Sequence, residues 1–242
     1  MLPKSIFTIH LIKQPSTRKI VDGVETYKEL KFRPYVVKEE KILMHAKESG
    51  EIKDIYTAVK QIITACCEEE IDVEKLPTFD LEYMFLRLRS ASVSNIETIQ
   101  ITHGDREYSG ELDFEKIEVT FPEKDISNVI EISPDVNLVM KYPTASVYDE
   151  SNEGILKKLK NKDMFDFVVN CIDKVYNGDI LLPMSNDELK EFLDGVGIPV
   201  YKKMKDFLVK MPKIIHKVYY TTATGEERFI QLSSLLDFFP FL

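Results

Sequence analysis

The feature that most constrains the fold is a change in the spacing of apolar residues near residue 95. Between Lys53 and Ser92, apolar side chains recur every three or four residues, which is typical of helices with one buried face. Between Asn95 and Met140 the spacing changes to two, and glycine and proline interrupt the pattern. A chain that carries the two periods in separate blocks is expected to fold into the α+β class.

Helical patterns occur on both sides of the alternating block. The expected helices cover residues 38–49, 53–66, 77–92, 185–194 and 199–211. A further helical stretch is expected to include residues 164–175. The first two are expected to form an antiparallel hairpin, since Gly50 ends the first. The third is expected to bury Leu81 and Met84 and to expose Glu82 and Arg89.

Strand patterns are expected at both ends of the chain and in the middle. The expected strands cover residues 6–12, 29–33, 99–102, 107–112, 116–121, 129–132, 136–140, 213–221 and 226–232. A polar loop over 15–27 is expected to separate the first two, and Thr224-Gly225 to turn the C-terminal β-hairpin.

This arrangement predicts a helical core with N-terminal strands, a small inserted antiparallel sheet and a C-terminal hairpin. The predicted domain organisation is 1–94, 95–142 and 143–242. In an alternative, residues 95–142 are a subdomain of one single domain.

A junction at residues 31–44 joins the second expected strand to the first expected helix. Pro34 disfavours helical angles at Arg33 and so ends the strand. The helix that follows begins with the charged turn Lys38-Glu39-Glu40-Lys41, which is predicted to face water or a partner.

Charge and composition indicate which partners suit the chain. Its 242 residues carry a formal net charge of −9, which disfavours a protein that coats nucleic acid or lies on an anionic membrane. The dense basic clusters 157–162 and 202–205 fit the wet faces of amphipathic helices. Apolar runs are far shorter than the roughly 20 residues that span a bilayer, and no signal core opens the chain. We therefore expect protein partners and a location in the cytosol.

The search for catalytic or metal-binding patterns yields none that is specific. The four histidines are dispersed, and neither a phosphate-binding glycine motif nor a GxSxG elbow occurs. Cys66, Cys67 and Cys171 lack a CxxC spacing and are interpreted as buried free thiols. The sequence predicts no enzyme, no metal and no cofactor, with a hydrolase built on an unrecognised carboxylate pair as an open alternative.

Ordered sequence segments give a resemblance to a known family. They are residues 31–43, 60–63, 72–86, 138–144, 171–176 and 211–213. With these segments in this order, the chain resembles the baseplate hub and hub-assembly proteins of T4-type contractile-tailed bacteriophages. The resemblance implies a non-enzymatic role in building the hub of the tail baseplate, either as a component or as an assembly factor.

Several expectations follow from the resemblance. The partners would be other baseplate hub or tape-measure proteins, with a homo-oligomer as a further option. The protein would act in the host cytoplasm during assembly and then in the virion tail baseplate. A transient chaperone for hub or tape-measure proteins, absent from the mature virion, is the alternative.

Candidate interface residues come from the junction and from the apolar C-terminus. They are Phe32, Arg33, Tyr35, Lys38, Glu39, Lys41, Phe238, Phe239, Phe241 and Leu242. The C-terminal aromatic residues are expected either to be buried against a partner or to fold back onto the chain's own core.

Overall fold

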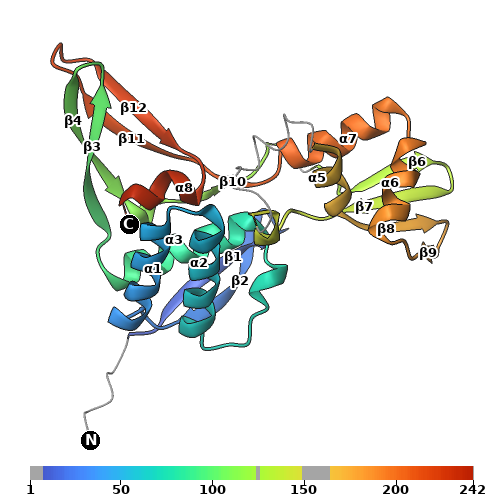
Figure 1. The fold of residues 1–242 in the computed structure, drawn as a ribbon, viewed down its shortest axis with the longest axis horizontal. Coiled ribbons are helices and arrows are strands. Elements are labelled where there is room, and N and C mark those ends of the chain that lie inside the picture. The colour runs from blue at the N-terminus through green and yellow to red at the C-terminus, as the bar shows by residue number, and fades with distance from the viewer. Residues whose placement is uncertain (1–7, 124–125, 149–163, 242) are drawn as a thin grey trace, which may run out of the picture. The chain divides into compact units, whose positions relative to one another are not determined.

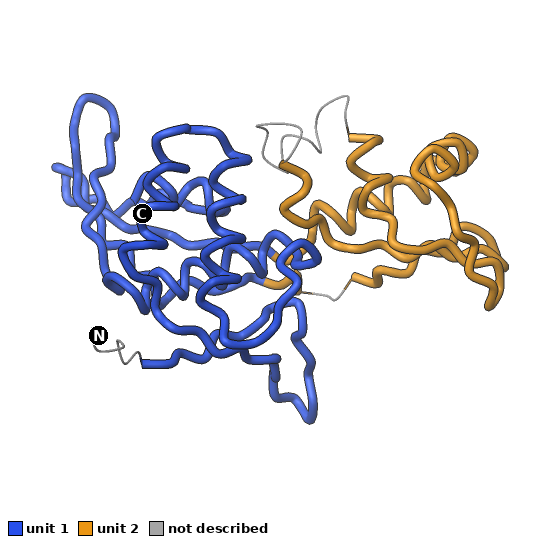
Figure 2. Tube along the Cα trace, turned by 60° about the horizontal axis from the view of Figure 1, so that its bottom comes forward, with its two compact units in different colours: residues 1–120, 213–242 blue, residues 121–212 orange. Residues whose placement is uncertain are grey.

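The structure, a computed structural model, describes residues 8–123, 126–148 and 164–241. The chain forms two compact units, unit 1 from residues 1–120 and 213–242 and unit 2 from residues 121–212 (Figure 2). Unit 2 is therefore an insertion within unit 1. Both units combine helices with small antiparallel sheets, and the predicted α+β class is confirmed.

Unit 1 contains three main helices and several hairpins (Figure 1). Its helices are α1 Val37–Ser49, α2 Ile52–Cys66, α3 Thr78–Ser92 and α8 Leu235–Phe238, with short 3-10 turns η1 Val73–Lys75, η2 Phe114–Lys116 and η4 Phe239–Phe241. Its strands are β1 His10–Val21, β2 Val24–Phe32, β3 Ile96–His103, β4 Arg106–Asp113, β5 Val119–Thr120, β10 Lys213–Ile214, β11 His216–Thr221 and β12 Glu227–Leu232.

Helix α3 is the centre of unit 1. It packs against β1 and α2, and nearly every one of its side chains is buried. The predicted burial of Leu81 and Met84 is confirmed, but the predicted exposure of Glu82 and Arg89 is wrong, since both are buried. Apolar residues occupy every side of this helix, so the whole helix is buried. The polar side chains on it are therefore buried as well.

The N-terminal hairpin is longer than predicted. Residues 15–27, expected to be a polar loop, belong to β1, β2 and the tight turn between them. Val21 pairs with Val24, so the turn residues are Asp22 and Gly23, at φ 53° and 78°. Such angles at both positions define the turn that suits a two-residue hairpin, and Asp-Gly is a typical sequence for it.

The strands expected to form one inserted sheet are divided between the units. β3 and β4 form a hairpin in unit 1, whereas residues 129–133 and 136–140 belong to unit 2. The hairpin β3–β4 packs against the predicted C-terminal hairpin β11–β12, which is confirmed with Gly225 in its turn (Figure 1).

Unit 2 is built on one antiparallel sheet in the order β6-β7-β8-β9. Its strands are β6 Val129–Ser133, β7 Val136–Met140, β8 Ile172–Asn177 and β9 Ile180–Leu182. Its helices are η3 Ala145–Tyr148, α5 Met164–Asn170, α6 Asn186–Asp194 and α7 Ile198–Val209. Tyr142 stacks on Phe207 of α7, with ring centroids 4.9 Å apart.

The helix predicted through residues 171–175 is wrong, because α5 ends at Asn170 and β8 begins at Ile172. Ile172 and Val175 are buried at a spacing that both a helix and an irregularly paired strand produce. Pairing with β7 on one side and β9 on the other favours the strand, since it satisfies the backbone. The predicted capping box is confirmed, with Ser185 and Glu188 at the start of α6.

Candidate interface surfaces

The junction over residues 31–44 is partly in the interior of unit 1 and partly exposed. Phe32, Tyr35 and Glu39 are all buried, at 0%, 6% and 1% exposure. The Tyr35 amide donates to Ser92 Oγ on α3 at 2.9 Å. These three side chains hold unit 1 together and are not accessible to a partner in this structure.

Arg33, which directly follows β2, forms hydrogen bonds to both α1 and α2. Its Nη2 atom donates to Glu39 Oε1 on α1 at 2.9 Å and to the Ala65 carbonyl on α2 at 3.0 Å. Its backbone amide donates to the Cys66 carbonyl at 3.0 Å, which continues β2 alongside the end of α2. The half-buried Arg33 is therefore a structural clamp.

Glu39 completes this clamp at the start of α1. Its Oε2 atom accepts from the Val36 amide at 3.0 Å, which satisfies one of the amides left free at a helix N-terminus. Burial raises the pKa of the Glu39 carboxyl, but the hydrogen bonds from Arg33 and Val36 outweigh burial, and the net pKa lies below its ordinary value. Glu39 is thus held in its charged form.

The C-terminal aromatic residues fold back onto unit 1. Phe238 and Phe239 are buried, at 0% and 6% exposure, and Phe241 is half-buried. The Phe238 ring lies 6.4 Å from the ring of His216 on β11. Of the two alternatives for these residues, the fold-back is the one that the structure adopts, and Leu242 lies outside the described residues.

Of the candidates from the junction, Lys38 and Lys41 are the exposed ones. Both lie on α1, where neighbouring Val37 is also exposed, at 71%. The basic residues 202–205 lie on α7 as predicted, with Lys202 and Lys203 exposed, whereas cluster 157–162 lies outside the described residues.

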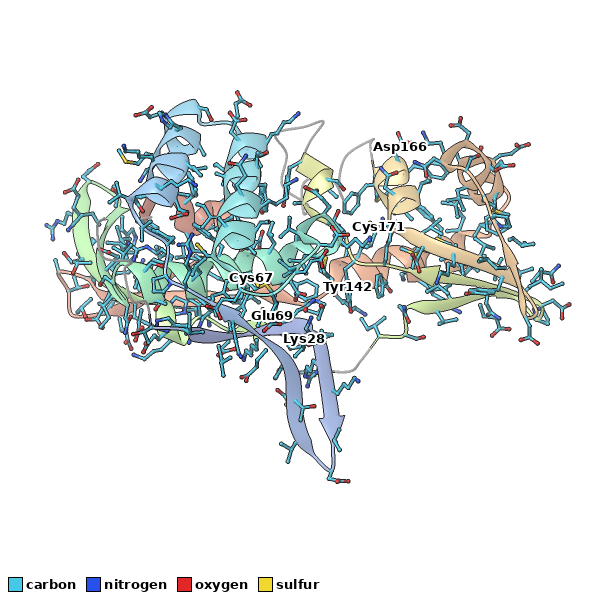
Figure 3. All side chains as sticks on the ribbon, turned by 90° about the horizontal axis from the view of Figure 1, so that it is seen from below. Lys28, Cys67, Glu69, Tyr142, Asp166 and Cys171 are labelled. Atoms are coloured by element: carbon cyan, nitrogen blue, oxygen red, sulfur yellow. The ribbon has the colours of Figure 1, made fainter. Side chains whose placement is uncertain are left out.

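The β1–β2 hairpin is an exposed surface that the sequence patterns did not indicate. It extends as a finger from the rest of unit 1 in Figure 3, and apolar side chains surround its turn. Ile20, Val21 and Val24 are 56%, 54% and 63% exposed. The signal that identifies this surface is the run Lys19-Ile20-Val21-Asp22-Gly23-Val24, in which apolar residues flank a turn sequence.

The base of this finger is anchored by a buried carboxylate on α3. Asp80 is fully buried, and its side chain accepts from the amide and the hydroxyl of Ser16 on β1. Burial raises the pKa of Asp80 to about 6, against the Ser16 hydrogen bonds, which lower it.

A second buried carboxylate lies farther along α3. Glu82 accepts a hydrogen bond from the Tyr56 hydroxyl of α2. Burial raises the pKa of Glu82 to about 7, against the lowering effect of hydrogen bonds from Tyr56 and from the Leu235 amide of α8. Glu82 therefore joins α2, α3 and the C-terminal α8.

A pocket of about 550 Å³ lies between β4 and β11 in unit 1. Its walls are formed by Glu111, Asp113, Ile215, His216, Lys217 and Tyr219. Lys116 also lines the pocket and forms an ion pair with Asp113 at 2.9 Å. Acidic and basic side chains are therefore balanced around it.

The cysteines have the character of unreactive thiols. Cys66 and Cys171 are buried, and burial raises their pKa values to about 11 and about 12. Cys67 is half-buried near Lys28 and Glu69 (Figure 3), and burial raises its pKa too. In the described part of the chain, no three histidine, cysteine or acidic side chains are grouped to hold a metal ion.

Among the helices in residues 8–123, 126–148 and 164–241, none is both long and apolar enough to cross a bilayer.

The described part of the chain combines small antiparallel sheets with a finger whose turn carries exposed apolar side chains. The sequence profile of the family described as T4 bacteriophage base plate protein matches residues 7–240. Because the match covers nearly the whole chain, the chain belongs to this bacteriophage baseplate family. Neither the curated proteins nor the solved structures gave a match.

Proposed function

We propose that the chain is a non-enzymatic component of the baseplate hub that works through contacts with other tail proteins. Membership of the baseplate family supports a location in the virion tail. The observation that carries the proposal is the β1–β2 finger, whose turn carries exposed Ile20, Val21 and Val24.

The finger has the properties of an element that becomes buried on assembly. An isolated two-stranded hairpin is marginally stable in water, and this hairpin extends beyond the Asp80–Ser16 anchor at its base. Val21 and Val24 are directly paired and therefore share one face, while Ile20 lies on the other. An element with apolar side chains on both faces suits insertion into a groove of a neighbouring protein.

The size of the effect can be estimated from the exposed side chains. Full burial of one aliphatic side chain contributes about 1.5–3 kcal/mol before ordering costs are subtracted. Three such side chains at one tip are enough to anchor a contact, while Lys38 and Lys41 on α1 offer a separate charged surface for the same or another partner.

Replacement of the finger tip by charge tests the proposal. In the variant Ile20→Lys/Val21→Lys/Val24→Lys, we expect the free energy of unfolding to change by less than about 1 kcal/mol, because exposed positions tolerate substitution. The yield of complete tails in a phage that carries it should fall by about a hundredfold or more, since several kcal/mol of contact energy are lost.

A matched control is Ile198→Lys, since Ile198 is 79% exposed on α7. This variant should assemble tails like the unchanged protein. Normal tail yield from the triple variant, with the chain present in those tails, would contradict the role of the finger.

The second candidate is a transient chaperone for hub or tape-measure proteins. The same exposed finger supports it, because a holding protein also needs an accessible apolar surface. Mass spectrometry of purified mature tails separates the two functions. A hub component should be found in mature tails at a fixed ratio to the other hub proteins. A transient chaperone should be absent from them.

A further inference from the structure

The pocket between β4 and β11 has an aromatic residue in its lining that is also exposed. Tyr219 of β11 lines the pocket, and its ring lies 5.7 Å from the ring of Phe229, its cross-strand partner on β12. The two side chains are 51% and 48% exposed, and they lie on the opposite face of the hairpin from buried Val218. Aromatic side chains are enriched at protein interfaces relative to the rest of a protein surface.

One ring of this pair already binds a cation. The Lys217 ammonium lies over the Phe229 ring, 4.3 Å from its centroid. A positive charge in this position is attracted by the negative face of the ring. In the described part of the chain, neither a lysine nor an arginine lies over the neighbouring Tyr219 ring. Tyr219 therefore offers a second aromatic surface that suits a cation.

The four charged side chains of the pocket are balanced in number, but their contacts differ. Lys116 forms an ion pair with Asp113 at 2.9 Å, and the pKa of Lys116 is raised mainly by Asp113 and only to a small extent by Glu111. Lys217 directs its ammonium toward Phe229, which is not part of the pocket lining. Among the described residues, Glu111 is therefore the carboxylate of this pocket that lacks an ion pair of its own.

His216 lines the pocket as a neutral group. It is half-buried, and its ring lies 6.4 Å from the Phe238 ring of α8. Burial lowers the pKa of His216, against a smaller opposite effect of Asp113. The imidazole is thus uncharged near neutral pH and does not repel a cation. Together with Ile215, it forms the less polar part of the lining.

We propose that this pocket, here called the guanidinium pocket, binds an arginine side chain of another tail protein. The guanidinium stacks on the Tyr219 ring and pairs with the Glu111 carboxylate, while the aliphatic stem contacts Ile215. The volume of about 550 Å³ lies in the range of ligand pockets and admits the side chain with adjoining backbone. This inference rests on the proposed function, because it takes the arginine from a protein of the tail.

Arginine suits this lining better than lysine or an anion. A guanidinium is planar, stacks on aromatic faces and donates two parallel hydrogen bonds to a carboxylate, whereas an ammonium is a compact and strongly hydrated charge. A phosphate group would meet the carboxylates of Glu111 and Asp113. Arginine is also among the residues that contribute most binding energy at protein interfaces.

The first test uses N-acetylarginine amide as the probe and the full-length protein. The readout is the NMR signal of the His216 ring, which is the histidine signal that persists when His10, His45 and His103 are each replaced by glutamine. This signal should shift with a Kd of about 1 mM, as expected for a ligand of this size. A His216 signal that does not shift at about 20 mM probe overturns the proposal.

Two related probes test the chemistry of recognition. N-acetylcitrulline amide has the shape of the arginine probe without its charge, and N-acetyllysine amide has the charge without the planar group. Both should bind about threefold more weakly or worse. Equal binding of the citrulline probe would show that charge is not recognised, and equal binding of the lysine probe would show that the guanidinium is not; either result overturns the proposal.

Two substitutions test the carboxylate and the aromatic ring separately. Glu111→Gln removes the charge and Tyr219→Leu removes the ring, and both positions are exposed, so the fold should tolerate them. Each should raise the Kd of the arginine probe about threefold or more. The matched controls are Glu107→Gln, on the same face of β4, and Tyr176→Leu, on β8 of unit 2, which should leave the Kd unchanged. An unchanged Kd in either pocket variant overturns the assignment.

Tail assembly then tests the source of the arginine. In a phage whose chain carries both Glu111→Gln and Tyr219→Leu, the yield of complete tails should fall about tenfold or more, whereas Glu107→Gln should leave it unchanged. If tails require the chain but assemble normally with the double variant, the ligand is not an arginine of a tail protein, and the hub role stands. Tails that assemble without the chain contradict the hub role itself, whatever the probe binds.

Discussion

At the scale of single residues, the polar groups inside unit 1 are the ones that define its connections. Arg33 and Glu39 join the end of β2 to α1 and α2, Asp80 anchors β1, and Glu82 joins α2 to α8. Each of these side chains lies where an apolar residue would leave backbone or hydroxyl groups without a partner. Burial disfavours the charged form of such groups. The pKa values of the two carboxyls of α3, Asp80 and Glu82, are raised for this reason.

Glu82→Gln is expected to stabilise the protein at alkaline pH. Burial raises the folded-state pKa of Glu82 to about 7 from an ordinary 4.5, so the folded state keeps a proton that the unfolded state loses between these values. The free energy of unfolding therefore falls as pH rises through this window. Glutamine keeps the acceptor for Tyr56 and should add about 3 kcal/mol near pH 8 and little near pH 4.

Urea unfolding over this pH range measures the effect, and Glu107→Gln, at an exposed position on β4, is the matched control. The control should keep the pH dependence of the unchanged protein. Equal stabilisation by Glu82→Gln at both ends of the range would show that the gain does not come from a buried ionisation.

At the scale of elements, the contact between the two hairpins depends on one glycine. Gly110 lies at the closest approach of β4 to β11, where an added Cβ would be 2.9 Å from Ile101 Cδ1 and closer still to Val218. Other contacts between the two hairpins depend on this short distance between β4 and β11. One of them is the hydrogen bond between Tyr220 Oη and His103 Nδ1, at 2.8 Å.

Gly110→Ala is expected to lower the free energy of unfolding by about 1–3 kcal/mol, because the hairpins must move apart to accept the methyl group. Gly195→Ala is the matched control, since its Cβ would lie 3.5 Å from the Phe192 carbonyl, an ordinary contact. Chemical denaturation of both variants measures the difference. If the two alanine variants are equally stable, the close approach of β4 and β11 does not limit packing.

Helices proved easier to predict than strand pairing. The starts and ends of α1, α2, α3 and α6 follow from local signals such as Gly50 and the Ser185 capping box. The sequence predicts neither the finger nor β8, because Asp22-Gly23 falls within the expected polar loop and Asn177-Gly178 follows the expected helical stretch, whereas each forms or begins the turn of a hairpin. Two-residue turns reveal themselves only when both flanking strands are recognised.

At the scale of the whole molecule, the insertion of unit 2 is the main organising feature. The chain leaves unit 1 through β5 and returns through β10, and these strands pair with Thr120 opposite Lys213. The two connections are therefore adjacent, which is the geometry that allows one folding unit to be inserted into another.

Unit 1 is expected to fold without unit 2. Replacing residues 121–212 by Asn-Gly joins Thr120 to Lys213 through a two-residue turn that suits an antiparallel pair. The product should unfold cooperatively, with a free energy of unfolding within about 2 kcal/mol of that measured for the same unit in the full chain. Circular dichroism during urea unfolding measures this.

The isolated fragment 121–212 provides the complementary measurement and should show its own cooperative transition. Loss of cooperative unfolding in both pieces would show that the two units stabilise each other and are not independent. A joined unit 1 that folds while the fragment does not would indicate that unit 2 alone depends on its host.

Local periodicity and ordered sequence segments are enough to predict the α+β class, most of the main helices, the C-terminal hairpin and the phage baseplate family. Tertiary structure alone decided which candidate residues are accessible. Phe32, Tyr35 and Phe238 are buried, whereas the tip of the finger is exposed. Burial arises from contacts between residues far apart in the chain, such as β4 with β11, and no local pattern encodes it.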